Sequence, residues 1–189
     1  MKVIQIRGTN AVGKTTAVRE FIKHGDFIIR DINVNGKIIE CHWEEERKIA
    51  IIGRYDKAAT GGVDSCIQKK ELLNNTIVKI IKTFKPDVLI FEGIMYGVTF
   101  EFAYKLVRVL KALHYDYVGL CFFPSLDVVF ERLAQRNGGK EVDYMSIQGK
   151  WFSAQKAYEK LKANGINVKS IDNSKIPKEL MYKIIEEEL

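Results

Sequence analysis

Residues 7–16 read Arg7-Gly-Thr-Asn-Ala-Val-Gly-Lys-Thr-Thr16, and this stretch decides the fold. The apolar segment before it, residues 1–6, has the pattern of a β-strand, and residues 17–23 after it have the pattern of a helix. Its spacing, Gly-x-x-x-x-Gly-Lys-Thr, lets successive backbone N–H groups curl around an anion. The stretch therefore predicts a phosphate-binding loop between a strand and a helix.

Each residue type in this loop has a chemical task. Gly8 and Gly13 allow backbone angles that a Cβ would obstruct, so the amides between them can point at a polyphosphate. We expect Lys14 to reach the β- and γ-phosphates of ATP, and the hydroxyl of Thr15 to bind Mg²⁺. The expected nucleotide-binding residues are therefore Gly8, Thr9, Asn10, Ala11, Val12, Gly13, Lys14, Thr15 and Thr16.

The composition is that of an ordinary globular protein. The chain has 189 residues, 47% of them hydrophobic and only three of them proline, which predicts a single domain over residues 1–189. The chain starts on a strand pattern and has no apolar run long enough to span a bilayer, so we expect a cytoplasmic protein that does not contact a membrane. Three widely spaced cysteines, Cys41, Cys66 and Cys121, predict buried, reduced thiols.

The net charge is moderately positive. Thirty Lys and Arg against 24 Asp and Glu give a formal charge of +6. Such an excess favours a polyanionic partner such as DNA, and a solvated basic surface without a partner accounts for it equally well. A monomer and a homodimer are both compatible with the sequence.

The order of the predicted strands suggests a sheet with an insertion. The strand at residues 2–7 is too continuously apolar for an exposed edge, which predicts a central position in a parallel sheet. Residues 27–53 contain three short β runs, and Asn35-Gly36 is a strong hairpin signal between the first two. We therefore expect a β-meander over 27–53, inserted after the first helix.

The polar loop at residues 53–64 is the second most informative stretch. Arg54 and Lys57 are candidate substrate ligands because their side chains can bind anions. Asp64 ends the loop at the start of a helical pattern that runs to about Phe84. Its carboxylate can cap that helix, take part in catalysis, or do both.

A second acid follows a buried strand. Glu92 ends the segment Asp87-Val-Leu-Ile-Phe-Glu, which looks like a Walker B strand. If this strand neighbours the one before the phosphate-binding loop, Glu92 can hold a Mg²⁺-bound water or orient an acceptor hydroxyl. The alternative is an acid that only caps the following turn.

The loop, the segment Val-Leu-Ile-Phe-Glu-Gly and the segment Glu-Arg-Leu-Ala-Gln-Arg at 131–136 together resemble the small P-loop kinases of the nucleoside-monophosphate kinase class. The resemblance covers nearly the whole chain. It implies an α/β P-loop NTPase fold with a parallel five-stranded sheet between helices. It also implies a lid over residues 132–150 and adenine near residues 172–175.

In this class a pair of arginines closes the lid over the phosphates, and the resemblance implies that role for Arg132 and Arg136. A guanidinium can bridge donor and acceptor oxygens as charge moves between them. The alternative is two solvated arginines that pair with neighbours such as Glu131.

A narrower likeness concerns the acceptor. The loop start Arg-Gly-Thr-Asn, the pair Gly-Arg-Tyr-Asp and Gly-Gly-Val-Asp within 53–64, and Phe-Glu-Gly at 91–93 are similar to bacteriophage P-loop kinases, including those proposed to phosphorylate 5-hydroxymethyluracil in DNA. Such a protein would act in the host cytoplasm. Thymidylate kinases carry Asp-Arg-Tyr where this chain has Glu92-Gly93, which argues against a plain dTMP kinase.

These observations predict an ATP-dependent kinase whose acceptor is a hydroxyl, best matched by the hydroxymethyl group of 5-hydroxymethyluracil in DNA. A hydroxyl acceptor gains from a positioned carboxylate, supplied by Asp64 or Glu92, with Asp31 as a reserve candidate. The alternatives are a kinase of free deoxynucleoside monophosphates and an NTPase without kinase activity. Salt dependence separates a polymeric acceptor from a free nucleotide.

Overall fold

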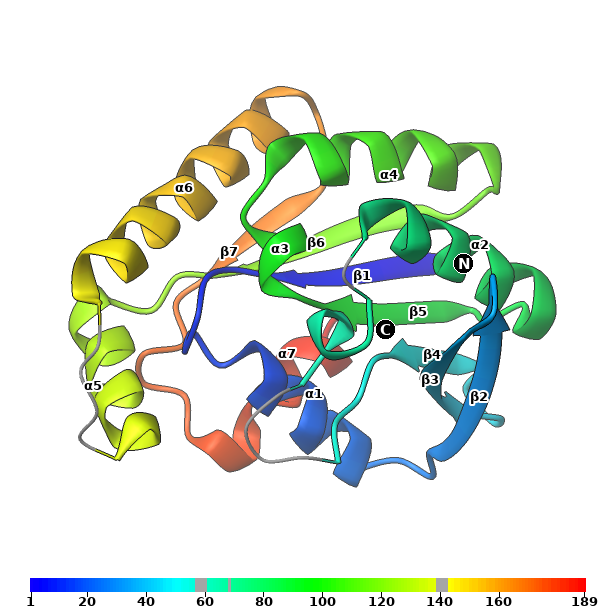
Figure 1. The fold of residues 1–189 in the computed structure, drawn as a ribbon, viewed down its shortest axis with the longest axis horizontal. Coiled ribbons are helices and arrows are strands. Elements are labelled where there is room, and N and C mark those ends of the chain that lie inside the picture. Colours follow the sequence, from blue (N-terminus) through cyan, green and yellow to red (C-terminus); the bar gives the residue numbers. More distant parts are fainter. Residues whose placement is uncertain (57–60, 68, 139–142) are drawn as a thin grey trace.

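The computed structural model describes residues 1–56, 61–67, 69–138 and 143–189. One seven-stranded sheet lies between layers of helices (Figure 1), with the strand order β2-β3-β4-β5-β1-β6-β7. The strands are β1 (Lys2–Arg7), β2 (Ile28–Val34), β3 (Lys37–Glu44), β4 (Ile49–Ile52), β5 (Val88–Glu92), β6 (Asp116–Phe122) and β7 (Val168–Ile171). The helices are α1 (Lys14–Lys23), α2 (Lys70–Phe84), α3 (Ile94–Gly97), α4 (Phe100–Ala112), α5 (Leu126–Asn137), α6 (Tyr144–Ala163) and α7 (Lys183–Glu186), with 3₁₀ turns η1 (Val63–Ser65) and η2 (Lys178–Leu180).

The sheet is larger than expected. Five strands run parallel in the order β4-β5-β1-β6-β7, and β3 and β2 extend the sheet antiparallel beyond β4. The predicted sheet of five strands is therefore too small, because β2 and β3 of the predicted meander extend the same sheet to seven strands. The physical reason lies in β4, whose four residues are all buried. Such a strand needs cover on both faces, and its side chains pack alternately into the two hydrophobic cores on either side of the sheet, while β5 pairs with its edge.

The hairpin signal is confirmed. Val34 pairs with Lys37 across a two-residue turn, and both turn residues, Asn35 and Gly36, have positive φ angles of 53° and 80°. Two-residue hairpins of this kind require positive φ at both central positions, which explains the Asn-Gly sequence.

Two hydrophobic cores cover the two faces of the sheet. One core packs α2 and α4 against it, together with Val63 and Tyr96 from the short turns beside them. The other core packs α1, α5 and α7 against the opposite face. No helix in the described part of the chain is both long and apolar enough to cross a membrane. The three cysteines are free and buried, as predicted.

Strand β1 lies at the centre of the parallel part, between β5 and β6, as its apolar sequence predicted. The chain passes from β1 to strands on one side of it and then returns to β6 on the other side. In open α/β sheets, ligands bind outside the carboxyl ends of the strands at such a reversal. The loop after β1 and Glu92 at the end of β5 both lie at this edge, with Ile6 and Glu92 in register.

The end of β1 is tied to the α3 region by a buried arginine. Arg7 is 1% exposed, and its guanidinium donates to the carbonyls of Tyr96 and Thr99 and to the side chain of Gln5. The Tyr117 hydroxyl donates to the same Gln5 oxygen, at 2.6 Å. Arg7 makes no ion pair with a carboxylate in the described part of the chain. Its charge is therefore balanced by carbonyl dipoles, and it holds residues 96–99 against the start of the loop.

We expect Arg7→Met to lower the free energy of unfolding by about 2 kcal/mol or more, because it removes a buried guanidinium and leaves the partly buried Thr99 carbonyl without its donor. Urea denaturation followed by circular dichroism measures this loss. Arg30→Met, which changes an exposed arginine on the edge strand β2, is the control and should stay within about 0.5 kcal/mol of the parent. Equal midpoints for both variants would contradict the structural role of Arg7.

Candidate active site

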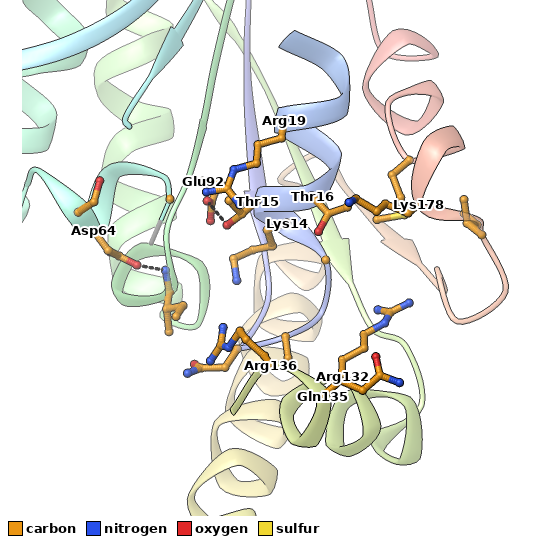
Figure 2. Close-up of a pocket in the computed structure, with 18 residues that line it drawn as sticks. Lys14, Thr15, Thr16, Arg19, Asp64, Glu92, Arg132, Gln135, Arg136 and Lys178 are labelled. Carbon is orange, nitrogen blue, oxygen red and sulfur yellow. Dashed lines mark hydrogen bonds between the residues drawn. The ribbon is translucent and has the colours of Figure 1, made fainter. Parts of the chain in front are cut away.

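A cavity of about 860 Å³ opens at the carboxyl edge of the sheet (Figure 2). The loop after β1, the start of α1, the turn η1, the end of β5, one side of α5 and the segment before α7 all contribute to it. The lining residues are Asn10, Ala11, Gly13, Lys14, Thr15, Thr16, Arg19, Gly61, Asp64, Ser65, Glu92, Ile94, Arg132, Gln135, Arg136, Ile176, Lys178 and Met181.

The loop backbone requires its glycines. Gly8 has φ +133° and Gly13 has φ +95°, a region that residues with a Cβ rarely adopt. A Cβ on Gly13 would lie 2.8 Å from Nδ2 of Asn173, which donates to the Val12 carbonyl. Asn173 is fully buried, so it fixes the curvature of the loop from behind.

Lys14 extends from this loop into a buried position. The side chain is 5% exposed, and Nζ donates to the Thr9 carbonyl at 2.6 Å. Burial lowers the pKa of Lys14, and the charges of Glu92 and Asp64 oppose that effect. The amine is therefore shielded from bulk water, which favours an anionic partner.

Glu92 and Thr15 form a pair at the base of the cavity. The Thr15 hydroxyl donates to Oε1 of Glu92 at 2.7 Å, and the carboxylate is 2% exposed. Burial raises the pKa of Glu92, while the Lys14 charge and the Thr15 hydrogen bond oppose the rise. Gly62 covers this pair, because a Cβ there would lie 2.4 Å from Oε1 of Glu92.

Asp64, in the turn η1, also lines the cavity. Its Oδ2 accepts a hydrogen bond from the backbone N–H of Ile94, the first residue of α3 (Figure 2). Its Oδ1 is buried and has no hydrogen-bond partner among the described residues. Burial raises the pKa of Asp64, and the Ile94 hydrogen bond and the Lys14 charge oppose the rise.

The expectation that Asp64 caps the helix ending at Phe84 is wrong. Asp64 lies within the 3₁₀ turn Val63–Ser65, and α2 begins only at Lys70. The hydrogen bond of Asp64 goes instead to the start of α3, a four-residue helix that the sequence did not indicate. Its carboxylate therefore joins the segment after β4 to the segment after β5.

The arginines of α5 lie across the cavity from Lys14 and Thr15 (Figure 2). Nη2 of Arg132 donates to the Asn173 carbonyl at 3.1 Å, while its Nη1 is buried without a hydrogen-bond partner among the described residues. Burial lowers the pKa of Arg132, opposed by the charges of Glu131 and Asp172. Arg136 also lines the cavity. Both side chains thus lie at the cavity wall, one helical turn apart.

Other predicted site residues lie outside the cavity lining. Asp31 is exposed on the edge strand β2, and Arg54 is exposed with Nε 3.7 Å from Oε2 of Glu40. Lys57 and part of the expected lid, residues 139–142, lie outside the described residues. Within the predicted loop, three residues do not line the cavity and instead shape it from behind: Gly8, Thr9 and Val12.

Several lining residues were not predicted. Arg19 lies on α1 and donates from Nε to the Tyr55 carbonyl, while Gln135 shares the α5 face with the two arginines. Lys178 and Met181 come from the segment before α7. The spacing of Arg19 after Lys14, just over one helical turn, could have placed it near the loop. The other contacts depend on chain packing.

The oxygen atoms at the base of the cavity fit a hard divalent cation such as Mg²⁺, which prefers carboxylate and hydroxyl ligands. The Thr15 hydroxyl and the Glu92 carboxylate already lie within 2.7 Å of each other. No group of three or more His, Cys, Asp or Glu side chains within the described ranges could hold a metal on its own. Any cation would therefore need ligands from a bound phosphate or from water, as Mg²⁺ commonly has.

Comparison with known proteins identifies the family. The model of the 5-hmdU DNA kinase family matches residues 2–171. This chain belongs to the 5-hmdU DNA kinase family. A 5-hmdU DNA kinase of Pseudomonas phage M6 is 27% identical over 178 residues, which cover 90% of this chain and 91% of the relative. The 5-hmdU DNA kinase 1 of Salmonella phage ViI is 30% identical over 150 residues, which cover 77% of this chain and 64% of the relative.

The matched region of this family member contains the entire loop after β1, Asp64, Glu92 and both α5 arginines. It ends at the last residue of β7, before Ile176, Lys178 and Met181. Most of the cavity wall therefore belongs to the part of the chain that defines the family.

Proposed function

We propose that the protein transfers the γ-phosphoryl group of ATP to the hydroxymethyl group of 5-hydroxymethyluracil in DNA. The observation that carries this proposal is the cavity, which places a cationic loop and two arginines opposite a half-buried carboxylate with a free oxygen. Membership of the 5-hmdU DNA kinase family supports the choice of acceptor.

The donor side is the loop of a P-loop NTPase fold. Residues 8–16 would surround the triphosphate with backbone N–H groups, and Lys14 would contact the β- and γ-phosphates. The shortage of water around Lys14 strengthens its attraction for the phosphates. Arg132 and Arg136, on the opposite wall, would contact oxygens of the transferring group as the arginines of the predicted lid over 132–150.

Mg²⁺ bound with ATP would neutralise charge that develops between the β- and γ-phosphates. The Thr15 hydroxyl and the Glu92 carboxylate are the groups that would hold it, directly or through water.

We assign the general base to Asp64. Glu92 already accepts a hydrogen bond from Thr15, whereas Asp64 lines the cavity and its Oδ1 has no hydrogen-bond partner among the described residues. Asp64 would take the proton of the acceptor hydroxyl as that oxygen bonds to the γ-phosphorus. The bond from phosphorus to the bridging oxygen breaks, and ADP leaves with its electron pair. The raised pKa of Asp64 makes its carboxylate a stronger base than an exposed aspartate.

Transfer of labelled γ-phosphate from ATP to a panel of acceptors tests this function. The panel contains DNA with 5-hydroxymethyluracil, unmodified DNA with 5′-hydroxyl ends, and free deoxynucleoside monophosphates. We expect label only on the modified DNA, at the base. Label at DNA ends would indicate a polynucleotide kinase, and label confined to mononucleotides would indicate a nucleotide kinase. Loss of γ-phosphate without any labelled acceptor would indicate an NTPase.

A further inference from the structure

Charge is distributed unevenly over the helices of the molecule. Helices α2, α4 and α6 form the upper edge of the molecule in Figure 1, and together they carry ten lysines and arginines against three glutamates, a net charge of +7. The whole chain carries only +6. Of the lysines and arginines in α1, α5 and α7, four line the cavity and do not add to the outer surface of the molecule: Lys14, Arg19, Arg132 and Arg136. The basic excess is therefore concentrated on α2, α4 and α6, along this edge of the molecule.

Within this surface, α4 carries an unpaired basic stripe. Lys105, Arg108 and Lys111 are all exposed, and within the described residues none of them makes a hydrogen bond or an ion pair. Their spacing of three residues extends the stripe over about 9 Å of helix. Tyr104 lies beside them, 39% exposed, with its ring packed 5.2 Å from that of Phe100. Cations without counter-ions beside an exposed aromatic ring are typical of nucleic-acid contact surfaces.

The stripe begins near the acceptor side of the cavity and runs from there along α4 toward the start of β6. The acceptor wall contains Asp64 in η1 and Ile94 in α3, and α4 follows α3 directly in the chain. Neighbours of these residues, Val63 and Tyr96, belong to the same hydrophobic core as α4. For a polymer whose reactive group enters next to Asp64, the start of α4 is therefore a neighbouring outer surface, from which the stripe continues along the helix.

We propose that the α4 stripe, defined as Tyr104, Lys105, Arg108 and Lys111, binds the phosphate backbone of the DNA that carries the acceptor base. This inference rests on the proposed function for its choice of polymer. DNA carries one negative charge about every 1.7 Å of duplex axis, so a stripe of this length can neutralise several phosphates. Such contacts position the polymer without reading its sequence, while the cavity selects the modified base.

The test is the triple variant Lys105→Gln, Arg108→Gln and Lys111→Gln, which keeps helix-forming side chains at exposed positions. The matched control, Lys23→Gln, Lys37→Gln and Lys183→Gln, removes the same charge from other exposed sites. Fluorescence anisotropy measures the affinity for 5-hydroxymethyluracil duplex DNA over a range of salt concentrations. We expect the slope of log affinity against log salt to fall in magnitude by about two to three in the α4 variant, and affinity at 0.1 M salt to fall roughly tenfold or more.

Kinetics provides the second readout. The α4 variant should show a higher KM for DNA with an unchanged kcat at saturating DNA, because none of its changed residues lines the cavity. A salt slope equal to that of the control would overturn the α4 assignment even where the wild-type protein phosphorylates modified DNA. A wild-type protein that neither binds nor phosphorylates DNA at low salt would overturn both the assignment and the proposed function.

Discussion

Lys14→Met should lower kcat for phosphorylation of 5-hydroxymethyluracil DNA by about 10²- to 10³-fold, the loss typical of removing one preorganised cation or donor from a transition state. Lys14 is the one loop side chain that extends its charge into the buried part of the cavity, where water does not screen it. Phosphate-transfer assays at saturating ATP and DNA measure the effect.

The fold should survive this change. Burial lowers the pKa of Lys14, so its charge costs folding free energy and a neutral side chain of similar length removes that cost. Lys23→Met on the same helix is the control, since Lys23 is exposed and pairs only with Glu20. Full activity in Lys14→Met would refute the assignment of the loop, whereas equal loss in both variants would indicate damage to α1.

Asp64→Asn should lower kcat by about 10²- to 10⁴-fold if Asp64 is the general base. The asparagine oxygen can still accept the hydrogen bond from Ile94, so the α3 segment stays in place. Asp56→Asn is the matched control, because Asp56 lies in the same connection between β4 and η1 but is exposed and does not line the cavity. Retention of kcat in Asp64→Asn would assign the base to Glu92.

The thermal unfolding midpoint of Asp64→Asn distinguishes a loss of catalysis from a loss of folding stability. Because the pKa of Asp64 is raised in the folded protein, folding becomes less favourable as pH rises through the interval between its unfolded and folded values. Asp64→Asn removes this cost, so at neutral pH its midpoint should equal or exceed that of the parent. A variant that is less active and clearly less stable would point to a structural role instead.

The pH profile is a further consequence of the same group. Activity requires ionised Asp64, so kcat/KM should fall with acid pH through the pKa of this carboxyl, which burial places above the usual aspartate range. The profile of Asp56→Asn should match that of the parent. If kcat/KM of Asp64→Asn falls at the same acid pH as that of the parent, even with a lower overall rate, another group is responsible for the pH dependence.

Local signals were sufficient for the parts of the site that lie within one strand, turn or helix. The glycine and lysine spacing of residues 8–15 predicted a loop between β1 and α1, and the apolar run before Glu92 predicted a buried strand with an acid at its carboxyl end. The one-turn spacing of Arg132 and Arg136 predicted that they share a helix face. In each case the determining interactions are between residues a few positions apart.

Contacts between distant segments required the tertiary structure. Asp64 and Ile94 are separated by 30 residues, and Asn173 and Val12 by 161, yet each pair forms a hydrogen bond that shapes the cavity. The pairing of β4 with β5 likewise turned an expected insertion into part of the main sheet.

The sequence alone thus determined the glycine-rich loop over residues 8–15 and the strand and helix on either side of it, because backbone freedom and side-chain periodicity are local properties. The tertiary structure decided which of the carboxylates that line the cavity keeps an oxygen without a hydrogen-bond partner, and which cations line the cavity and which remain exposed on α4. Those outcomes depend on burial and charge pairing across the whole molecule, and residue spacing along the chain does not encode them.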